Sequence, residues 1–563
     1  MAVLRNKVLF FTTSPRSPHK MIPEIRLLHD KFEGAKWDHS TQEAFIDELA
    51  KSSFFEGTGS PSDKAFSARD RITRSPKSLG FVDLKPTISL TAAGNEFIYG
   101  KRPQEIFLRQ LLKYQLPSPY HKENKKIAGA FFIHPYLEIL RLIRTLEYLT
   151  FDELKIFALQ LTDYRDFDKI KDKIILFRNN KIKNKGEYKK IVNSLWVNVI
   201  MKIYSDDIAS GKTKTRETKD ASLKNFILTK KRNMRDYTDA CFRNLRYTGL
   251  VSISHKNRSI YVSEDKVKEV DFILANVDRN PIFISDLAEY KKHLFSTNKP
   301  FLYTDNKDNI IDILMKIGTF TKRELIGMEL EKLKDLRDEV VKKHMASVIH
   351  EQVQKIKSYA LYSEIIDTFN EIISDGYYDS PLMFEYNTWR AMTMLDGGDI
   401  KGNFKFDDLG QPLSTAQGNM PDIECDYSDF SMSVEVTMQK GQRQYETEGE
   451  PVARHYGQLK KRSGKDTYCL FIAPTINPAV IAHFFTLNRT NISYYGGKSK
   501  IIPLDLDLFM KLVENSYNYE SHPKSTDIRN LLDDIIDKAV SASDEIEWYD
   551  YIQSIASNWL VSI

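Results

Sequence analysis

Cysteine is scarce in this sequence. Its 563 residues include three, Cys241, Cys425 and Cys469, which are widely spaced and form no CxxC pair. Isolated thiols of this kind exclude a disulfide framework and argue against a zinc site. We therefore expect three buried, inert thiols in a reducing cytoplasm.

Long apolar runs are also missing. No stretch reaches the roughly 18 consecutive apolar residues that suggest a membrane-spanning helix, so no membrane span is expected. The apolar run within residues 1–11 is too short for a signal peptide and predicts a first β-strand. A Gly-Lys-Thr triplet at residues 211–213 lacks the upstream glycine and strand of a phosphate-binding loop, which excludes an ATP site.

The net charge is small, at +5, but it is unevenly distributed. Residues 201–260 hold 14 Lys and Arg against 6 Asp and Glu, a local charge of +8. Such a basic block on a near-neutral chain is typical of a module that binds a polyanion, although a solvated charged face has the same composition. The length predicts three or four domains, and a hydrophobic content of 41% is enough to give them cores.

One acidic pair organises the candidate chemistry. Asp422 follows Pro421, and after twelve intervening residues comes Glu435, the first residue of Glu-Val-Thr. The intervening residues predict two strands joined by a tight turn at residues 427–430, so that Asp422 and Glu435 face one point. Two carboxylates at one point repel unless a cation lies between them, and hard oxygen ligands suit Mg²⁺. The alternative is a solvated hairpin with surface acids.

Other residues supply neighbours for this pair. Glu385 lies among aromatic residues on a predicted helix, and Glu448 and His455 are seven residues apart, two turns along a second helix that we expect to begin near Pro451. The apolar run at residues 468–473 predicts a buried central strand. This order of helices and strands predicts a mixed sheet with helices on its faces. The alternative for Glu385 is an ordinary acid on the surface of a helix, with no part in a metal site.

The site departs from the PD-(D/E)XK pattern at one position. That pattern has a lysine two residues after the second acid, where this chain has Thr437. Lys440, three residues further on, is the candidate substitute.

Two basic regions predict winged-helix-like DNA-recognition modules, near residues 60–115 and 220–265. In both, a helix is followed by a glycine turn and a short hairpin, and in the second the predicted strands cover residues 251–253 and 259–262. Arginine contacts guanine bidentately or holds phosphate, so basic side chains here are candidate DNA contacts; unpartnered surface arginines are the alternative. The candidates are Arg16, Arg69, Arg71, Arg74, Lys77, Arg235, Arg243 and Arg246.

Taken together, several motifs resemble those of a known family. The sequence is similar, over nearly its whole length, to the type IIS restriction and nicking endonucleases grouped with AlwI, PleI, MlyI and BstNBI, within the PD-(D/E)XK nuclease superfamily. The motifs that carry this resemblance are SPRSP (14–18), AFSARDR (65–71), RYTGL (246–250), FEYNTW (384–389), GNMPD (418–422), EVT (435–437), EGEPVARHY (448–456) and LFIAP (470–474).

The resemblance implies a multi-domain α/β architecture with three parts: a DNA-recognition region at 1–270, a helical linker at 271–345 and a nuclease domain at 346–563. It implies Mg²⁺-dependent cleavage, with one or two ions per site, a few bases outside an asymmetric five-base site. The GAGTC-like site is favoured over GGATC. The residues that match the family's catalytic positions are Glu385, Asp422, Glu435, Glu448 and His455, with Lys440 added from this sequence.

The expected partner is double-stranded DNA. One nuclease site cuts one strand, so a transient homodimer, a separate small subunit or successive cuts would complete a double-strand break. A bacterial cytoplasmic protein is expected, with no membrane association. The rival hypothesis is a DNA-binding regulator that carries an inactive nuclease fold.

Overall fold

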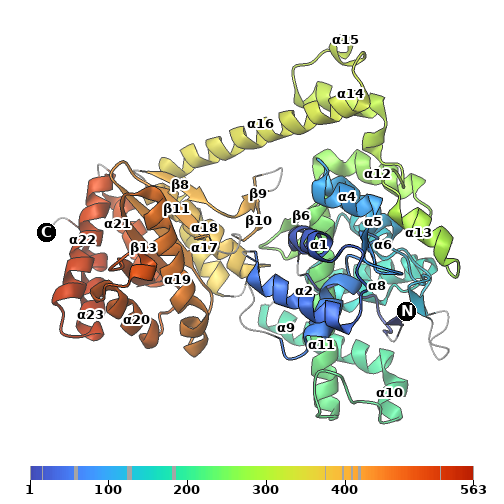
Figure 1. Cartoon of the computed structure of the whole chain (residues 1–563), viewed down its shortest axis with the longest axis horizontal. Coiled ribbons are helices and arrows are strands. Elements are labelled where there is room, and N and C mark those ends of the chain that lie inside the picture. The colour runs from blue at the N-terminus through green and yellow to red at the C-terminus, as the bar shows by residue number, and fades with distance from the viewer. Residues whose placement is uncertain are drawn as a thin grey trace. The chain divides into compact units, whose positions relative to one another are not determined.

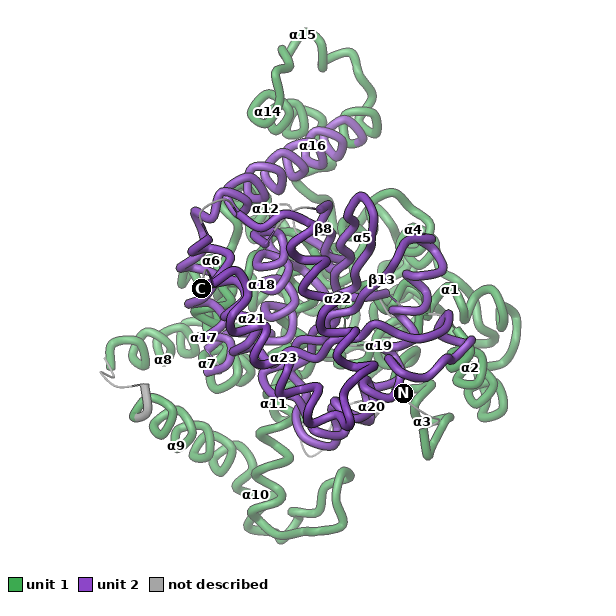
Figure 2. The backbone as a smooth tube through the Cα atoms, turned by 90° about the vertical axis from the view of Figure 1, so that its left-hand side faces the viewer, with its two compact units in different colours: residues 1–334 green, residues 335–563 purple. Residues whose placement is uncertain are grey.

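The computed structural model describes residues 2–561 except 5, 16, 53, 56–60, 123–129, 181–184, 375, 396–397, 407–409, 416–419 and 520–521. The chain divides into two compact units, residues 1–334 and residues 335–563 (Figure 2). All three cysteines are buried and free, as the sequence predicted. No helix in the described ranges is long and apolar enough to cross a membrane.

Unit 1 is mainly helical. Its α-helices are α1 (Pro18–Phe32), α2 (His39–Lys51), α3 (Lys64–Ala68), α4 (Ala92–Tyr99), α5 (Pro103–Lys113), α6 (Pro135–Leu146), α7 (Phe151–Ile156), α8 (Phe167–Asn179), α9 (Lys185–Ile203), α10 (Ser205–Ala209), α11 (Leu223–Tyr247), α12 (Val267–Asn276), α13 (Leu287–Phe295), α14 (Lys307–Ile317) and α15 (Lys322–Leu325). Its strands are β1 (Ala2–Val3), β2 (Val82–Asp83), β3 (Ser89–Leu90), β4 (His121–Lys122), β5 (Tyr148–Thr150), β6 (Val251–Ser254) and β7 (Ser259–Val262). The expected first strand is thus reduced to the two residues of β1.

The first basic region has the predicted order of elements. Helix α3 continues into a π-helix, η1 (Arg69–Thr73), and a turn at Gly80 leads to the β2–β3 hairpin and then to α4. Gly80 adopts a positive φ of +79°, a conformation that side-chain-bearing residues rarely adopt. Thr91 begins α4, because its hydroxyl accepts a hydrogen bond from the Gly94 amide at 2.9 Å.

The second basic region also has the predicted helix and hairpin, and it gains a third strand. Helix α11 leads into the antiparallel β6–β7 pair, and β5 adds to the free edge of β7. Strand β5 lies between α6 and α7 in the chain, about a hundred residues before β7. Figure 1 labels α6, α11 and β6 of this region. The element order is therefore helix, strand, helix, then α8 to α10, then helix and hairpin.

Unit 2 contains the mixed sheet that the sequence predicted. Its helices are α16 (Leu330–Lys357), which begins in unit 1, α17 (Tyr362–Ile373), α18 (Ser380–Leu395), α19 (Gln442–Ser463), α20 (Pro478–Arg489), α21 (Leu506–Asn518), α22 (Ser525–Ser541) and α23 (Glu545–Asn558). Its strands are β8 (Asp399–Gly402), β9 (Lys405–Phe406), β10 (Pro412–Ser414), β11 (Ile423–Asp426), β12 (Phe430–Val436), β13 (Asp466–Ala473) and β14 (Ile501–Asp505).

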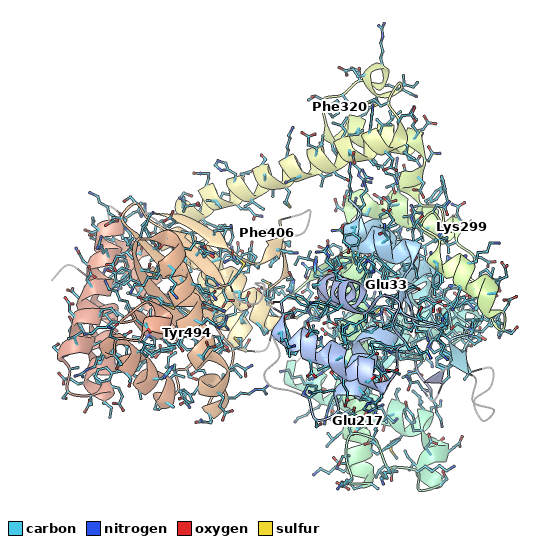
Figure 3. All side chains as sticks on the ribbon, viewed as in Figure 1. Glu33, Glu217, Lys299, Phe320, Phe406 and Tyr494 are labelled. Carbon is cyan, nitrogen blue, oxygen red and sulfur yellow. The ribbon has the colours of Figure 1, made fainter. Side chains whose placement is uncertain are left out.

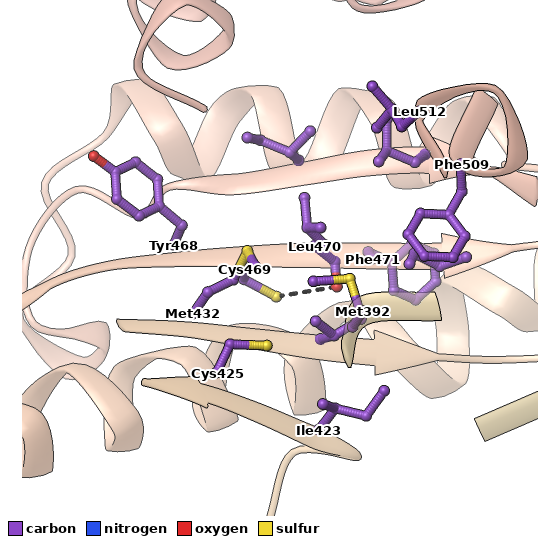
Figure 4. Packing of buried hydrophobic residues seen from close by; sticks show 14 of the residues in the cluster. Met392, Ile423, Cys425, Met432, Tyr468, Cys469, Leu470, Phe471, Phe509 and Leu512 are labelled. Carbon is purple, nitrogen blue, oxygen red and sulfur yellow. Dashed lines mark hydrogen bonds between the residues drawn. The ribbon is translucent and has the colours of Figure 1, made fainter. Parts of the chain in front are cut away.

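The five-stranded sheet has the order β14-β13-β12-β11-β8. Strands β12, β13 and β14 are parallel, and β11 is antiparallel to both of its neighbours. Helices α18 and α21 pack against the sheet and each other, as do α19 and α20. Figure 4 shows part of the apolar core, which includes Met392 of α18 and Met432 of β12. Strand β13 is buried along nearly its whole length, as expected for a central strand.

Helix α19 begins earlier than the sequence predicted. It starts at Gln442, after Gly441 at a φ of +63°, so Pro451 lies inside the helix and not at its start. Proline lacks the N–H that would bond the carbonyl one turn earlier, and neighbouring contacts outweigh that loss here. One such contact is at Gly457, which packs against the Tyr495 backbone in the 3-10 helix η6 (Ser493–Tyr495). Figure 3 labels Tyr494 of η6.

We predict that Gly457→Ala destabilises the protein. A Cβ at Gly457 would lie 2.9–3.1 Å from backbone atoms of Tyr495, closer than van der Waals contact. Such overpacking costs about 1–3 kcal/mol, whereas alanine normally gains about 0.5–1 kcal/mol over glycine inside a helix. The measurement is the free energy of unfolding in denaturant.

Gly449→Ala is the matched control in the same helix, because its Cβ would meet His483 at an ordinary 3.5 Å. It should be neutral or stabilising. Greater stability of the Gly457→Ala variant than of the wild type would contradict the close approach.

Candidate active site

Asp422 and Glu435 lie side by side at one end of the sheet. The antiparallel register of β11 and β12 pairs Ile423 with Val434, so the next pair along is Asp422 and Glu435, on one face of the hairpin. The Val436 amide donates a hydrogen bond of 2.7 Å to Asp422 Oδ2. The structure therefore contains the hairpin that the sequence predicted, with both acids at its open end.

Helix α19 brings two more polar side chains to this pair. His455 Nδ1 lies 3.0 Å from Glu435 Oε1, and both side chains are buried. Glu448, seven residues earlier, accepts a hydrogen bond of 2.9 Å from the Thr437 hydroxyl. Because residues seven apart lie on one helix face, α19 presents both groups to the end of β12.

Burial governs the electrostatics of the cluster. It raises the pKa of Asp422 well above its ordinary value, and the charges of Glu435 and Glu448 raise it further. Burial likewise raises the pKa of Glu435, with Glu448 adding to the shift, and raises the pKa of Glu448 itself. Without a cation, the site therefore disfavours the ionisation of all three carboxyl groups at once.

His455 is a neutral base in this setting. Burial, helped by the charge of Arg454, lowers its pKa to about 4. With Nδ1–H donating to the Glu435 carboxylate, Nε2 carries the lone pair. Nε2 is buried, and no protein group in the described ranges forms a hydrogen bond with it. The structure thus offers one unused acceptor beside the acids.

Thr437 occupies the position where the PD-(D/E)XK pattern has lysine. It is buried, and its backbone amide donates to Ile472 of β13 at 3.1 Å, which continues the β12–β13 ladder. Its hydroxyl faces the cluster and fixes Glu448. Lys440 is exposed in the segment before α19, and it forms no hydrogen bond or ion pair with any described residue.

Glu385 is buried on α18, the helix that packs against β8 and β12. Its neighbour Tyr386 packs edge-on against Phe404, with ring centroids 5.7 Å apart. Asn403, next to Phe404, donates its backbone N–H to the Asp422 carbonyl at 2.9 Å. The residue after Glu385 thus packs beside the segment that bonds Asp422, whereas the charged neighbours that shift the pKa of Asp422 are Glu435, Glu448 and His455.

The donor set fits a hard divalent cation by its chemistry. Asp422, Glu435 and Glu448 provide carboxylate oxygens, the ligands that Mg²⁺ prefers, and their mutual repulsion is what a cation would relieve. Across the described residues, no three His, Cys, Asp or Glu side chains converge closely enough to hold a metal ion. The acids are therefore near enough to repel one another, although their side chains do not converge into a formed ligand set.

The candidate DNA contacts of the first basic region begin with two exposed arginines. Arg69 is exposed and donates to Gln42 Oε1 at 2.7 Å. Arg74 is exposed and forms an ion pair of 2.6 Å with Asp70. Arg16 lies outside the described residues.

Arg71 and Lys77 are less available. Arg71 forms an ion pair with Glu24, whose carboxyl is buried, and burial raises the pKa of Glu24 to about 7. Lys77 is half-buried, with its ammonium 4.7 Å from the centre of the Tyr120 ring, and burial lowers its pKa. Both side chains hold parts of unit 1 together.

The three arginines of α11 differ in exposure. The side chain of Arg235 is 66% exposed. Arg243 is half-buried and bonds Asp239 at 2.9 Å, and Arg246 is buried. Spacing alone suggested one shared face, but the helix turns Arg246 into the core while Arg235 faces solvent.

Sequence reasoning missed one cationic feature. Phe66 is exposed, and two guanidinium groups lie over its ring, that of Arg74 at 5.6 Å and that of Arg216 at 4.9 Å from the ring centre. Arg216 comes from the segment between α10 and α11. No local pattern reveals this contact, because its partners are some 140–150 residues apart.

The chain belongs to a known class of DNA-cleaving enzymes. A family model described as AlwI restriction endonuclease matches residues 77–512, well over half of the chain. The protein is therefore a member of the AlwI restriction endonuclease family, a DNA-binding deoxyribonuclease, and the resemblance noted in the sequence is confirmed. Among curated protein sequences, no match was found.

Three solved structures are also similar. The small subunit (R.BspD6I2) of the heterodimeric restriction endonuclease R.BspD6I is 27% identical, with a TM-score of 0.28, covering 36% of this chain and 98% of that one. The BpuJ1 endonuclease binding domain, solved with modified DNA, is 13% identical, with a TM-score of 0.33 and coverages of 52% and 94%. Restriction endonuclease FokI is 11% identical, with a TM-score of 0.22 and coverages of 91% and 96%.

The raised pKa values predict that Asp422→Asn stabilises the protein when no metal ion is bound. An acid whose pKa is higher in the folded than in the unfolded state binds its proton more tightly when folded, so stability falls as pH rises above the ordinary pKa of about 4. The amide keeps an acceptor for the Val436 amide and removes the charge. Without divalent cations, the variant should melt at a higher temperature than the wild type near pH 8.

The difference should shrink as pH falls through about 4 and vanish below it, where Asp is protonated in both states. Glu446→Gln, an exposed acid on α19, is the control and should melt like the wild type. Equal or lower melting of the Asp422→Asn variant at pH 8 would contradict the repulsion.

Proposed function

We propose that this restriction endonuclease is of type IIS. It binds an asymmetric five-base site, GAGTC-like in preference to GGATC, and hydrolyses phosphodiester bonds a few bases outside it. Each active site cuts one strand and depends on Mg²⁺. The observation that carries the proposal is the buried acid pair Asp422 and Glu435, with Glu448 and His455 presented to it by α19.

Asp422 and Glu435 are the proposed metal ligands, with Glu385 as the third carboxylate, for one or two ions. A bound Mg²⁺ would neutralise charge that develops on the phosphate and lower the pKa of a coordinated water. The hydrogen bond from the Val436 amide orients Asp422, and the imidazole of His455 orients Glu435.

The remaining polar groups handle water and phosphate. His455 Nε2, neutral and unused, accepts a hydrogen bond from the attacking water and then its proton. Glu448, held by Thr437, orients that water or supports a second ion. Lys440, exposed beside the cluster, contacts the scissile phosphate in place of the lysine that the wider pattern has at Thr437.

DNA recognition is assigned to residues 1–270, with residues 271–345 as linker and 346–563 as the nuclease domain. Support comes from the second basic region, where α6, β5, α7, α11 and the β6–β7 hairpin follow the order of a winged helix, with α8 to α10 inserted. In that arrangement α11 is the helix that enters the major groove. Its exposed Arg235 is the first candidate for a base contact.

The other basic candidates serve the same surface. Arg69 and Arg74 are exposed and suit phosphate contacts, and Arg71 and Lys77 support them from within unit 1. Arg243 and Arg246 hold α11 in place. A monomer with two such modules reads an asymmetric site without the palindrome that a symmetric dimer prefers. Cutting of the second strand would then use a transient homodimer or a separate small subunit.

The rival is a DNA-binding regulator with an inactive nuclease fold. It shares the DNA-binding surface and predicts binding without any cut. The acid cluster disfavours it, because three neighbouring carboxylates with raised pKa values, Glu435 buried and Asp422 and Glu448 half-buried, destabilise the fold and have no evident structural use.

We predict defined, Mg²⁺-dependent cleavage of plasmid DNA by the purified protein. Glu435→Ala removes one of the paired acids and the partner of His455, so it should abolish cutting. DNA binding in a gel-shift assay should stay near normal, since unit 1 carries the proposed recognition surface. Mapping the ends on both strands distinguishes nicking from double-strand cleavage and gives the offset.

Glu446→Gln serves as the control and should cut like the wild type. If the wild type makes no cut with Mg²⁺ or Mn²⁺ while still binding a specific site, the regulator hypothesis holds. Loss of DNA binding in Glu435→Ala would show that Glu435 is structural.

We further predict that Arg235→Ala weakens specific binding by about 1–3 kcal/mol, the cost of losing a bidentate base contact. Discrimination should relax at one base pair of the site, as competition with substituted sites would reveal. Arg323→Ala, an exposed arginine of α15, is the control and should bind as the wild type does. Uniform weakening on all sequences would make Arg235 a phosphate contact instead.

A further inference from the structure

One residue that is not among the acids, Asn403, holds the chain on both sides of Asp422. Asn403, immediately after β8, donates its backbone N–H to the Asp422 carbonyl at 2.9 Å. Its side-chain amide donates to the Pro421 carbonyl at 2.8 Å and to Glu424 Oε1 at 3.1 Å. Asn403 thus bonds the residue before Asp422, Asp422 itself and the residue two positions after it.

Glu424 extends this network to helix α19. Glu424 Oε2 accepts a hydrogen bond of 2.6 Å from Arg462. Arg462 lies seven residues after His455, which lies seven after Glu448, so all three project from one stripe of the helix. The stripe makes three links to the sheet: Glu448 to Thr437, His455 to Glu435, and Arg462 to Glu424.

The first two links hold candidate catalytic groups, and the third does not touch them. It joins the helix that carries Glu448 and His455 to Glu424, which accepts a hydrogen bond from Asn403. The acids on the hairpin and the groups on α19 are therefore tied together by a further link, through Glu424 and Arg462. A displacement of about 1 Å at a catalytic group can cost roughly a hundredfold in rate, so such a tie matters.

We infer that Asn403 is a positioning residue for the nuclease site. It sets the place of Asp422 through the backbone and, through Glu424 and Arg462, couples that place to α19. The inference rests on the proposed nuclease function, because it assumes that Asp422 acts in cleavage. No direct contact of Asn403 with DNA or metal is involved.

The first test compares the full-length Asn403→Ala variant with the wild type. The single-turnover cleavage rate should fall about 10- to 100-fold, the range expected for a misplaced catalytic group, while DNA affinity stays unchanged. Hydrogen exchange should quicken in the peptide that covers residues 421–426, because alanine keeps the backbone donor and loses the side-chain clamp. The apparent affinity for Mn²⁺, measured by calorimetry without DNA, should fall as well.

Asn403→Asp is the second variant. It preserves the shape but loses the amide donors and places a carboxylate against the Pro421 carbonyl and Glu424, so its loss should be at least as large. Arg462→Ala removes only the outer link, from a side chain that is 56% exposed, and should give a smaller loss. Lys461→Ala, its exposed neighbour, bonds the Tyr494 carbonyl and should leave every readout unchanged.

The outcomes separate the inference from the proposed function. If the wild type cuts and Asn403→Ala matches it in rate, Mn²⁺ affinity and exchange, the inference is wrong and the function stands. If exchange rises evenly over β11, β12 and β13, Asn403 supports the whole fold, which also overturns the inference. If the wild type does not cut, the proposed function fails, while exchange and Mn²⁺ binding still show whether Asn403 positions Asp422.

Discussion

The repulsion between two buried carboxylates is the constraint on which unit 2 depends. The β11–β12 register places Asp422 beside Glu435, and burial raises the pKa of both. An isolated pair of this kind would separate or stay protonated. Here the Val436 amide fixes one acid and His455 the other, so the surrounding structure keeps them together at a cost in stability. That arrangement makes sense for a site whose charge is balanced only when a cation is bound.

Helix α19 supplies the polar side chains that surround this acid pair. It adds Glu448 and His455 from one face, and Gly457 lets its backbone approach Tyr495 closely enough to seat that face against the sheet. At the position where the PD-(D/E)XK pattern has a lysine, Thr437 donates to Glu448. The positive charge expected there is thus replaced by a neutral donor. In the proposed mechanism, Lys440 and a bound cation would face the phosphate instead.

Much of this was predictable from local sequence signals. The strand and turn pattern of residues 423–436 predicts the hairpin, and the apolar run at 468–473 predicts the buried strand. Strand β8 was missed because Asp399–Gly402 is short and mostly polar, and β5 because it is three residues between two helices. The start of α19 was placed at Pro451, since proline usually marks a helix start and tertiary contacts overrode that preference. The partners of Thr437, Asn403 and Phe66 depend on contacts between distant segments, which no local pattern encodes.

The central claim is that Asp422 and Glu435 are held together in order to share a cation. Calorimetric titration of Mn²⁺ into the full-length protein, without DNA, tests it most directly. The account predicts saturable binding to the wild type that is lost when Asp422→Asn and Glu435→Gln are combined, with the doubly substituted protein still folded. Equal Mn²⁺ binding by the wild type and the doubly substituted protein would contradict the account.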